Sequence, residues 1–204
     1  MDKLSSIKIR KREILILNNF IGWCLVMEFF DVIKKRTSIS KYKDSKISKE
    51  SIDKMIEAAM RAPSWKNRSA FRIIIVDDED KKNEIAESIR NKDDKACNAV
   101  KEAPIAMVII AKPDDSGEVE GKDFYLVDSA IAMEHIILAA TAEGYGTLWI
   151  GAIDEGEVKD ILKIPDEYKI IGITPVGEIA EEKEHYKAKD IKEFAFKNEY
   201  NNPY

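Results

Sequence analysis

Cysteine and histidine are scarce in this sequence. Its two cysteines, Cys24 and Cys97, form no CxxC pair, and its two histidines, His135 and His185, belong to no HExxH motif or carboxylate cluster. Metal sites need such ligands at close spacing, and a disulfide framework needs more cysteines. We therefore expect two reduced thiols, a cytoplasmic protein and no metal site.

Glycine-rich nucleotide-binding motifs are also missing. Gly144, Gly146 and Gly151 come closest among the nine glycines. A Rossmann fingerprint runs from a strand through the glycines into a helix, whereas here a helix comes first and a strand follows. No Walker lysine accompanies the glycines either. These absences argue against a dinucleotide domain, for which a single domain leaves little room.

The chain has no excess of positive charge. Its formal net charge of -5 argues against a general nucleic-acid binder. Hydrophobic residues make up 45% and charged residues 35%, which is the composition of an ordinary globular protein. A length of 204 residues is enough for one domain with a good core.

Residues 1–26 differ from the remainder of the chain. Residues 7–12 are basic and residues 14–26 are mostly apolar, but two asparagines interrupt the apolar run and no small-residue cleavage site follows. A signal peptide or membrane anchor is therefore a weak interpretation. We favour Met27 as the true start, with the earlier residues as upstream sequence read through; a partly ordered appendage is the remaining alternative. The predicted domain covers residues 27–204.

Residues 125–154 are the stretch around which this domain is organised. Their first half is apolar nearly all round, which is typical of a buried helix, and its acidic and histidine side chains argue against a membrane span. Gly144 ends the predicted helix. Residues 145–150 then predict a strand, which Gly151 breaks in a turn that can expose backbone donors to a ligand.

The other predicted elements alternate between helices and strands. We expect helices at residues 28–35, 48–62, 80–91 and 155–163 and after Asp190, and strands at residues 71–76, 104–111 and 170–179. Ser48 and Asp154 supply helix caps, whereas Pro175 argues for an edge position or a bend in the last strand. The remaining segments are expected to be a charged, mobile run at residues 91–101, a polar loop at 112–122 and an extended tail at 198–204.

Three polar segments could bind a ligand. Residues 36–38 offer a guanidinium and hydroxyls, which donate to phosphate oxygens, although the helix dipole also explains cations at a helix end. The loop at residues 63–67 carries Asn67, which could pair with a heterocycle or serve only as a turn residue. Lys187 and Lys189 could be solubilising charge. Taken singly, each segment is better explained by its ordinary alternative.

In this order and spacing, the segments resemble one family, the FMN-dependent nitroreductases, from residue 27 to about residue 200. The matching motifs are Arg36-Thr37-Ser38, Pro63-Ser64-Trp65-Lys66-Asn67, Gly144-Tyr145-Gly146-Thr147-Leu148-Trp149-Ile150-Gly151, Pro175-Val176-Gly177 and the pair Lys187 and Lys189. The glycine-rich central motif is the most specific of them. Each motif alone is weak, so the ordered set carries the resemblance.

The resemblance implies an α+β fold, with a mixed sheet flanked by helices, in an intertwined homodimer that holds FMN at its interface. It implies an oxidoreductase in which NADH or NADPH reduces the flavin and leaves. A small-molecule acceptor such as a nitroaromatic or a quinone then takes its place, in a two-electron ping-pong scheme. The flavin carries the chemistry, so no catalytic side-chain acid or base is expected, and neither a nucleic acid nor a membrane is expected as a partner.

The resemblance also implies the cofactor-binding residues. These are Arg36, Thr37, Ser38, Ser40, Pro63, Ser64, Trp65, Asn67, Ile150, Gly151, Ala152, Lys187 and Lys189. Among them, Arg36, Ser38, Lys187 and Lys189 are assigned to the FMN phosphate, and the amide of Gly151 to flavin N5.

Two departures from the family pattern keep other functions open. The family usually has a basic residue where Ser40 stands, and Gln-Pro-Trp where residues 69–71 read Ser-Ala-Phe. We therefore retain two alternatives: a flavin store or redox sensor without efficient turnover, and a dimeric α+β protein without flavin. Trp65 and Phe71 are candidates for an apolar wall, although core packing explains Phe71 equally well. Small residues on the central helix and the coreless tail both favour a dimer.

Overall fold

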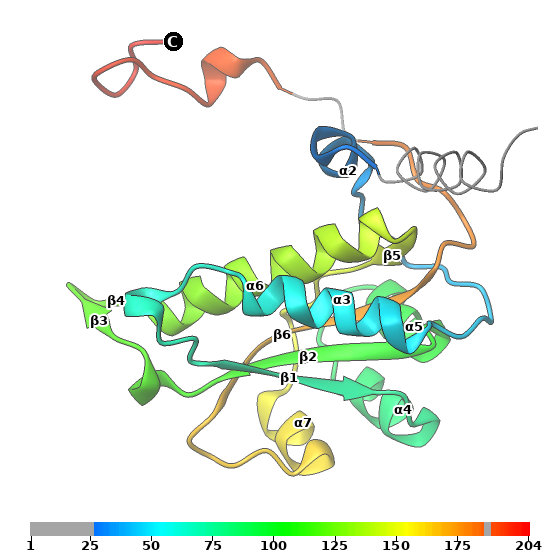
Figure 1. Ribbon diagram of the computed structural model, residues 1–204. Helices are drawn as coiled ribbons and strands as arrows, with labels where there is room; N and C mark the ends of the chain where they lie inside the picture. The colour runs from blue at the N-terminus through cyan, green and yellow to red at the C-terminus, as the bar shows by residue number, and fades with distance from the viewer. Residues whose placement is uncertain (1–26, 186–188) are drawn as a thin grey trace, which may run out of the picture.

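The computed structural model describes residues 27–185 and 189–204. Residues 1–26 and residues 186–188 lie outside this range (Figure 1). The N-terminal extension, Cys24 and Lys187 therefore remain matters of prediction.

Four antiparallel strands form the main sheet. Their order is β1 (Phe71–Val76), β2 (Ile105–Ala111), β6 (Lys169–Glu178) and β5 (Tyr145–Thr147). Within the described ranges, parallel pairing is confined to the single bridge between Ser38 and Thr147. A short hairpin of β3 (Glu118–Val119) and β4 (Lys122–Asp123) lies apart from the sheet.

Helices cover both faces of this sheet, as Figure 1 shows. One face carries α3 (Lys49–Met60) and α6 (Phe124–Ala142); the other carries α4 (Glu79–Glu87), α5 (Lys95–Glu102) and α7 (Glu155–Leu162). The remaining elements are α2 (Phe29–Lys35), which contacts α6, and the single turns η1 (Trp65–Asn67), η2 (Pro113–Asp115) and η3 (Ile191–Glu193). The expected α+β class is confirmed.

The sequence of strand β2 does not alternate between apolar and polar residues, because both faces of the strand are covered. All seven of its residues are buried, because Met107 and Ile109 face the core under α3 and α6 while Val108 and Ile110 face the core under α4, α5 and α7. Successive side chains of a strand point to opposite faces, so a strand covered on both sides is apolar throughout.

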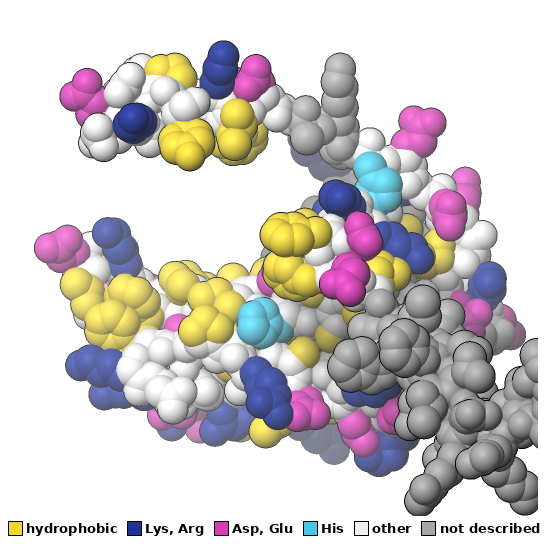
Figure 2. All heavy atoms as spheres, turned by 45° about the horizontal axis from the view of Figure 1, so that its top comes forward, with side chains coloured by type: hydrophobic (Ala, Val, Ile, Leu, Met, Phe, Trp, Pro, Cys, Tyr) yellow, Lys and Arg dark blue, Asp and Glu magenta, His cyan; other side chains and the backbone are white. Residues whose placement is uncertain are grey.

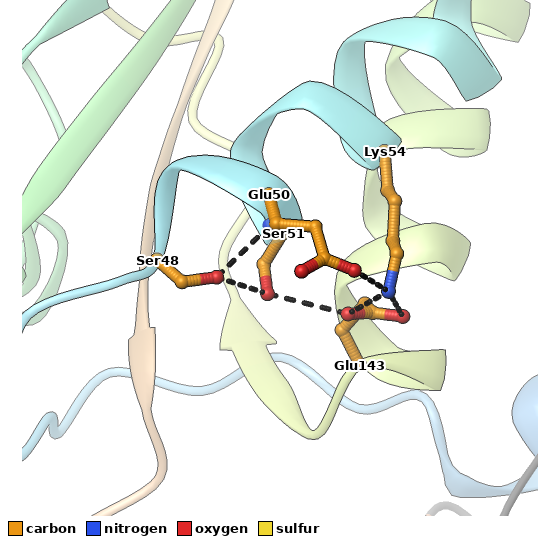
Figure 3. A network of polar contacts seen from close by, with 5 residues as sticks. All are labelled: Ser48, Glu50, Ser51, Lys54 and Glu143. Carbon is orange, nitrogen blue, oxygen red and sulfur yellow. Dashed lines mark hydrogen bonds and ion pairs between the residues drawn. The ribbon is translucent and has the colours of Figure 1, made fainter. Parts of the chain in front are cut away.

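A polar network ties the start of α3 to the end of α6 (Figure 3). Ser48 caps α3 as predicted, its Oγ accepting from the amide of Ser51 at 3.0 Å. The Ser51 hydroxyl donates to Glu143 at 3.2 Å, and Lys54 Nζ donates to the same carboxylate at 3.1 and 3.2 Å. Glu143, together with Glu50 at 3.3 Å from Lys54 Nζ, raises the pKa of Lys54. The network fixes how α3 lies along α6.

Two sequence-based expectations about the sheet side are corrected. Residues 91–101 were expected to be mobile, but residues 95–102 form α5, because Ala96, Ala99 and Val100 give this charged run one apolar face that the core buries. Of the two alternatives that Pro175 suggested, an edge position or a bend, the edge position is wrong, because β6 is an interior strand. Pro175 sits just past the last β5 pair, Thr147 with Val176, so its missing N–H removes no bond of that pairing.

Three element boundaries also differ from expectation. The predicted strand at residues 145–150 pairs only over β5 and again at the bridge between Ile150 and Ile173. The expected polar loop at residues 112–122 contains η2 and β3. The expected extended tail curls back, because Phe196 pairs with Pro203 and the amide of Tyr204 donates to Ala195 O at 3.0 Å. At these three places, short turns and isolated bridges stand where the sequence predicted a longer strand, an irregular loop and an extended tail.

Helix α6 is buried on one face only. In the part of the chain that the structure describes, it is the one helix long and apolar enough to cross a membrane. Its inner residues Ala132 and Met133 are 0% exposed against the sheet, so core packing accounts for its composition. Val127 on its outer face is 46% exposed, and Leu126, near the start of the helix, is 45% exposed.

The small residues of α6 divide in the same way. Ser129, Ala132 and Ala140 are buried within the chain, so they pack the chain's own core rather than a partner. Ala130 and Ala139 remain partly exposed.

Candidate functional site

Residues 36–40 run along the free edge of β5. The amide of Ile39 donates to Thr147 O at 2.8 Å, and the Ile39 side chain is 2% exposed. It lies against Gly146, where an added Cβ would come within 2.8 Å of it, so the glycine permits this close approach. Tyr42 fixes the same turn by donating its hydroxyl to Ile39 O at 2.7 Å. Burial, helped by the charge of Glu102, raises the pKa of Tyr42, which keeps the phenol protonated as a donor.

This anchoring leaves the neighbouring polar side chains facing a cavity of about 870 Å³. It is lined by Ile33, Lys34, Arg36, Thr37, Ser38, Lys183, Glu184 and His185. Arginine and hydroxyl donors beside lysine and histidine form a donor set that suits a phosphate. The structure thus brings Arg36, Thr37 and Ser38 together on one cavity wall, and it adds Lys183 and His185, which sequence reasoning did not select.

Ser40 and Lys189 are placed elsewhere. Ser40 lines a second, smaller hollow of about 240 Å³ with Lys41, Lys95, Glu181 and Lys183. Lys189 Nζ lies 5.8 Å from the centre of the Phe194 ring, within the C-terminal segment. Lys189 is not among the residues that line the larger cavity, so its phosphate role stays a prediction.

The loop at residues 63–69 is held at the opposite end of α6. The amide of Trp65 donates to Asp128 Oδ1 at 2.8 Å, and the amide of Ser69 donates to Ser64 Oγ at 3.0 Å. The Trp65 ring stacks on Phe124, with centroids 4.0 Å apart and planes at 25°. Pro63 and Asn67 are exposed at the loop surface. The loop therefore presents an amide side chain and a fixed aromatic ring to its surroundings.

Phe71 belongs to the core. Its side chain is 6% exposed and packs in the cluster under α3 and α6. Of the two candidates for an apolar wall, only Trp65 is accessible enough to contact a ligand directly.

The turn at residues 150–152 is fastened on both sides. Ile150 exchanges two backbone hydrogen bonds with Ile173, at 2.9 and 2.8 Å. Ala152 O accepts from the amide of Arg90 at 2.8 Å. Gly151 between them is exposed, and its amide makes no hydrogen bond to the described part of the chain. A free donor at a rigid turn is available to a ligand.

Two supporting residues escaped sequence reasoning. Asp128 is 2% exposed and accepts from both Trp65 and Ser116. The usable signal was a single carboxylate on the inner face of an otherwise apolar helix, since such a charge is buried only where it is hydrogen-bonded. Ser116, in the expected polar loop, gave no comparable signal. The described residues contain no cluster of possible metal ligands, and Cys97 is a free thiol.

With this geometry established, comparison with known proteins identifies the family. The profile of the nitroreductase family matches residues 33–178, well over half of the chain. The chain belongs to the nitroreductase family. The matched range contains the cavity segment, the Trp65 loop and the Gly151 turn, and it excludes Lys187 and Lys189.

Individual relatives agree with this membership. A nitroreductase family protein of Clostridium novyi NT has a similar crystal structure, with a TM-score of 0.74 and 43% identity, covering 87% of this chain and 97% of that one. A structure described as an FMN-dependent nitroreductase of Clostridium difficile is 33% identical, with a TM-score of 0.72, covering 82% and 98%. A protein of Archaeoglobus fulgidus, provisionally named an NADH dehydrogenase/NAD(P)H nitroreductase, is 30% identical over 167 residues, 80% of this chain and 92% of its own. This member of the family is therefore an oxidoreductase.

Proposed function

We propose that this nitroreductase binds FMN and uses NADH or NADPH to reduce small-molecule acceptors such as nitroaromatics or quinones in a two-electron, ping-pong reaction. The observation that carries the proposal is the cavity lined by Arg36, Thr37 and Ser38. Its hydroxyl and guanidinium donors fit the terminal phosphate by which FMN differs from riboflavin. Bound FMN would accept two electrons from the nicotinamide and pass them to the acceptor.

The phosphate end depends on local positive charge. The chain carries a net charge of -5, so a dianion needs a basic pocket against the overall field. Arg36 offers a fork of donors, and Lys183 at the same cavity offers a point charge. Lys187 and Lys189 remain proposed partners from the C-terminal segment.

The ring end depends on backbone and amide donors. Gly151 holds an N–H that donates to none of the described residues, at a turn beside Ile150 and Ala152, and such a donor suits an acceptor nitrogen of the flavin ring. Asn67 and Trp65 offer an amide and an aromatic surface. These groups orient the ring and exclude water, and we assign no side-chain acid or base to the reaction.

A homodimer would complete this site. Ser38 pairs with Thr147, just beyond the C-terminal end of α6, whereas Trp65 is tied to Asp128 near its start. Thr141, near the end of α6, lines a small hollow with Thr37. Along the helix axis it lies about 20 Å from Asp128. A second copy running antiparallel along the outer face of α6 would bring its Trp65 loop toward the first copy's phosphate cavity.

The C-terminal segment supports the same assembly. It stands away from the body of the chain in Figures 1 and 2 and exposes Ile191, Phe194 and Tyr200, which are 62%, 71% and 80% accessible. Exposed apolar side chains in such a segment are typical of a contact with another chain. We propose that it wraps the partner subunit.

Titration of the apoprotein with FMN and with riboflavin tests the proposed function. Charge-assisted hydrogen bonds contribute roughly 1.5–3 kcal/mol each, so Arg36→Ala should weaken FMN at least about tenfold, or roughly 1.4 kcal/mol. Riboflavin affinity should hardly change. Lys81→Ala on α4 removes one positive charge on the far face of the sheet and serves as the control. Equal losses for the two flavins, or no FMN binding by the wild type, would refute the assignment.

The C-terminal lysines are tested in the same titration. Lys187→Ala with Lys189→Ala should close most of the gap between FMN and riboflavin if these lysines reach the phosphate. Lys183→Ala is the matched alternative, since Lys183 already lines the cavity. If only Lys183→Ala weakens FMN binding, the phosphate contact is assigned to Lys183 instead of Lys187 and Lys189.

A flavin store or redox sensor is the second candidate. The observation that favours it is Ser40, which stands where the family usually has a basic residue and lines the separate hollow. Steady-state oxidation of NADH and NADPH by the holoprotein with a panel of acceptors separates the two functions. Continuous turnover supports the reductase, whereas a single slow bleaching of the flavin supports the store.

A further inference from the structure

The Trp65 loop has an unusual backbone. Lys66, Asn67 and Ser69 have φ values of 50°, 57° and 47°, in the left-handed region, and none of them is a glycine. Side chains other than glycine are disfavoured there. Such a conformation persists only where the surrounding structure holds it, and it tends to occur at functional sites.

The contacts that hold this loop converge on Asp128. Its Oδ1 accepts from the amide of Trp65 at 2.8 Å, directly before the left-handed residues, and its Oδ2 accepts from the hydroxyl of Ser116 at 3.3 Å. The carbonyl of Ser116 in turn accepts from Arg68 Nη1 at 2.7 Å, on the far side of Asn67. Asp128 is 2% exposed, and the described donors to its two oxygens are the Trp65 amide and the Ser116 hydroxyl.

The aromatic ring of the loop is confined by the same surroundings. Trp65 lies between Phe124, on which it stacks, and Gly117, where an added Cβ would come within 2.5 Å of Nε1. The amide of Phe124 donates to Gly117 O at 2.9 Å, which holds the two residues that flank the ring together. Loop backbone, indole ring and α6 therefore form one unit, with the Asp128 carboxylate as its central acceptor.

We propose that Asp128 is a positioning residue that holds the loop at residues 64–69, including the left-handed conformation of Lys66, Asn67 and Ser69, and thereby orients Asn67 and Trp65 toward the flavin ring. The proposal rests on the proposed function, because the flavin is what the loop would contact. Asp128 itself touches no ligand and acts through the amide of Trp65 and through Ser116.

A flavin-independent measurement tests the loop first. In apoprotein carrying Trp23→Phe and Trp149→Phe, Trp65 is the remaining tryptophan. Asp128→Ala should shift its emission to longer wavelength and raise its acrylamide quenching about twofold. Asp128→Asn keeps an oxygen for the Trp65 amide and should stay near the wild type. Unchanged fluorescence in Asp128→Ala would overturn the proposal whether or not the protein binds flavin.

Flavin affinity then separates positioning from simple stabilisation. Asp128→Ala should weaken FMN and riboflavin by the same factor, about tenfold, because the loop lies at the ring end and not at the phosphate end. Asn67→Ala should give a comparable loss, and the double variant should be no weaker than either single one, since both act through one group. Additive losses, or a lower melting temperature with unchanged flavin affinity, would refute positioning. No flavin binding by the wild type would instead reject the proposed function.

Two further variants guard this test. Ser129→Ala is the matched control, since Ser129 is the next residue on α6 and is fully buried, and its hydroxyl has no partner within the described residues; it should leave fluorescence and affinity unchanged. If Asp128→Ala fails to fold, Gly117→Ala takes its place in the fluorescence test. The added methyl group displaces the Trp65 ring from the other side, so the emission should shift to longer wavelength and the acrylamide quenching should rise.

Discussion

The inner and outer faces of α6 carry the same kind of residue in different surroundings. Ala132, Met133 and Ile136 on the inner face are all 0% exposed, packed on the sheet. Val127 on the outer face is 46% exposed. Figure 2 shows hydrophobic side chains gathered on the open side of the molecule, below the C-terminal segment.

The difference shows what an all-round apolar helix predicts. Such a helix must be covered, but its composition does not say whether its own chain or another one covers it. The inner face is covered within the chain, and we propose that the outer face is covered by a second copy. Substitutions on the two faces should therefore have different consequences: loss of the fold on one face, and loss of the dimer on the other.

The largest effect is expected on the inner face. Ala132→Arg places an unpaired charge in a packed core, which costs several kcal/mol out of a total stability of roughly 5–15 kcal/mol. The variant should be insoluble or unfolded, as measured by circular dichroism and thermal melting. A folded, soluble Ala132→Arg protein would contradict the inner position of this residue.

A moderate loss of stability is expected at the neighbouring position. Met133→Ala leaves a cavity in the same core and should lower the free energy of unfolding by about 2–5 kcal/mol. Urea unfolding of the wild type and the variant measures it. A change well below 1 kcal/mol would mean that the core under α6 is less tightly packed than the structure indicates.

Val127→Arg on the outer face should spare the fold and break the assembly. Because this side chain is half exposed in the single chain, the charge remains solvated in the monomer and is buried only in a dimer. Light scattering should report a folded monomer with weakened FMN binding, since the proposed site is shared. A dimer of unchanged affinity would show that another surface joins the two copies.

The smallest effect is a pH dependence at Glu134, on the outer side of α6. Partial burial raises the pKa of this carboxyl above its ordinary 4.5, while Arg36 and His135 oppose the shift. The folded state therefore holds the proton more tightly. The resulting stability is present below pH 4.5 and is lost as the pH rises through the higher folded pKa.

Glu134→Gln removes this titration. Melting temperatures of the variant and the wild type should be similar near pH 4, and the variant should be the more stable near pH 7. An advantage for the wild type near pH 7 would mean that attraction to Arg36 outweighs burial.

The sequence predicted local features of this fold more reliably than features that depend on packing. The caps at Ser48 and Asp154 were predicted correctly, because a capping bond joins residues three positions apart: Ser51 to Ser48 at 3.0 Å and Glu157 to Asp154 at 3.1 Å. Helix α5 was missed, because its apolar face is only three small residues in a charged run.

The sequence predicted several residues of the candidate site, but it did not predict which residues come together there. The motif at residues 36–38 was selected, and the structure places it on a cavity wall, but Lys183 joins that wall from the far end of the chain. The loop at residues 63–67 was also selected, but Asp128 and the left-handed backbone of the loop were not predicted. Whether Lys187 and Lys189 reach the same cavity remains a prediction.

By itself, the sequence determined the family, the order of the elements and the local caps and turns. These depend on residue types and short spacings along the chain, which a sequence displays directly. The tertiary structure decided which face of α6 is open, which bases meet at the cavity, and how a buried carboxylate holds a strained loop. Those features bring together residues that are tens to more than a hundred positions apart, such as Arg36 and Lys183, which line one cavity, and Trp65 and Asp128, which share a hydrogen bond. Only the packing of α6 and its neighbours on the sheet brings such residues together.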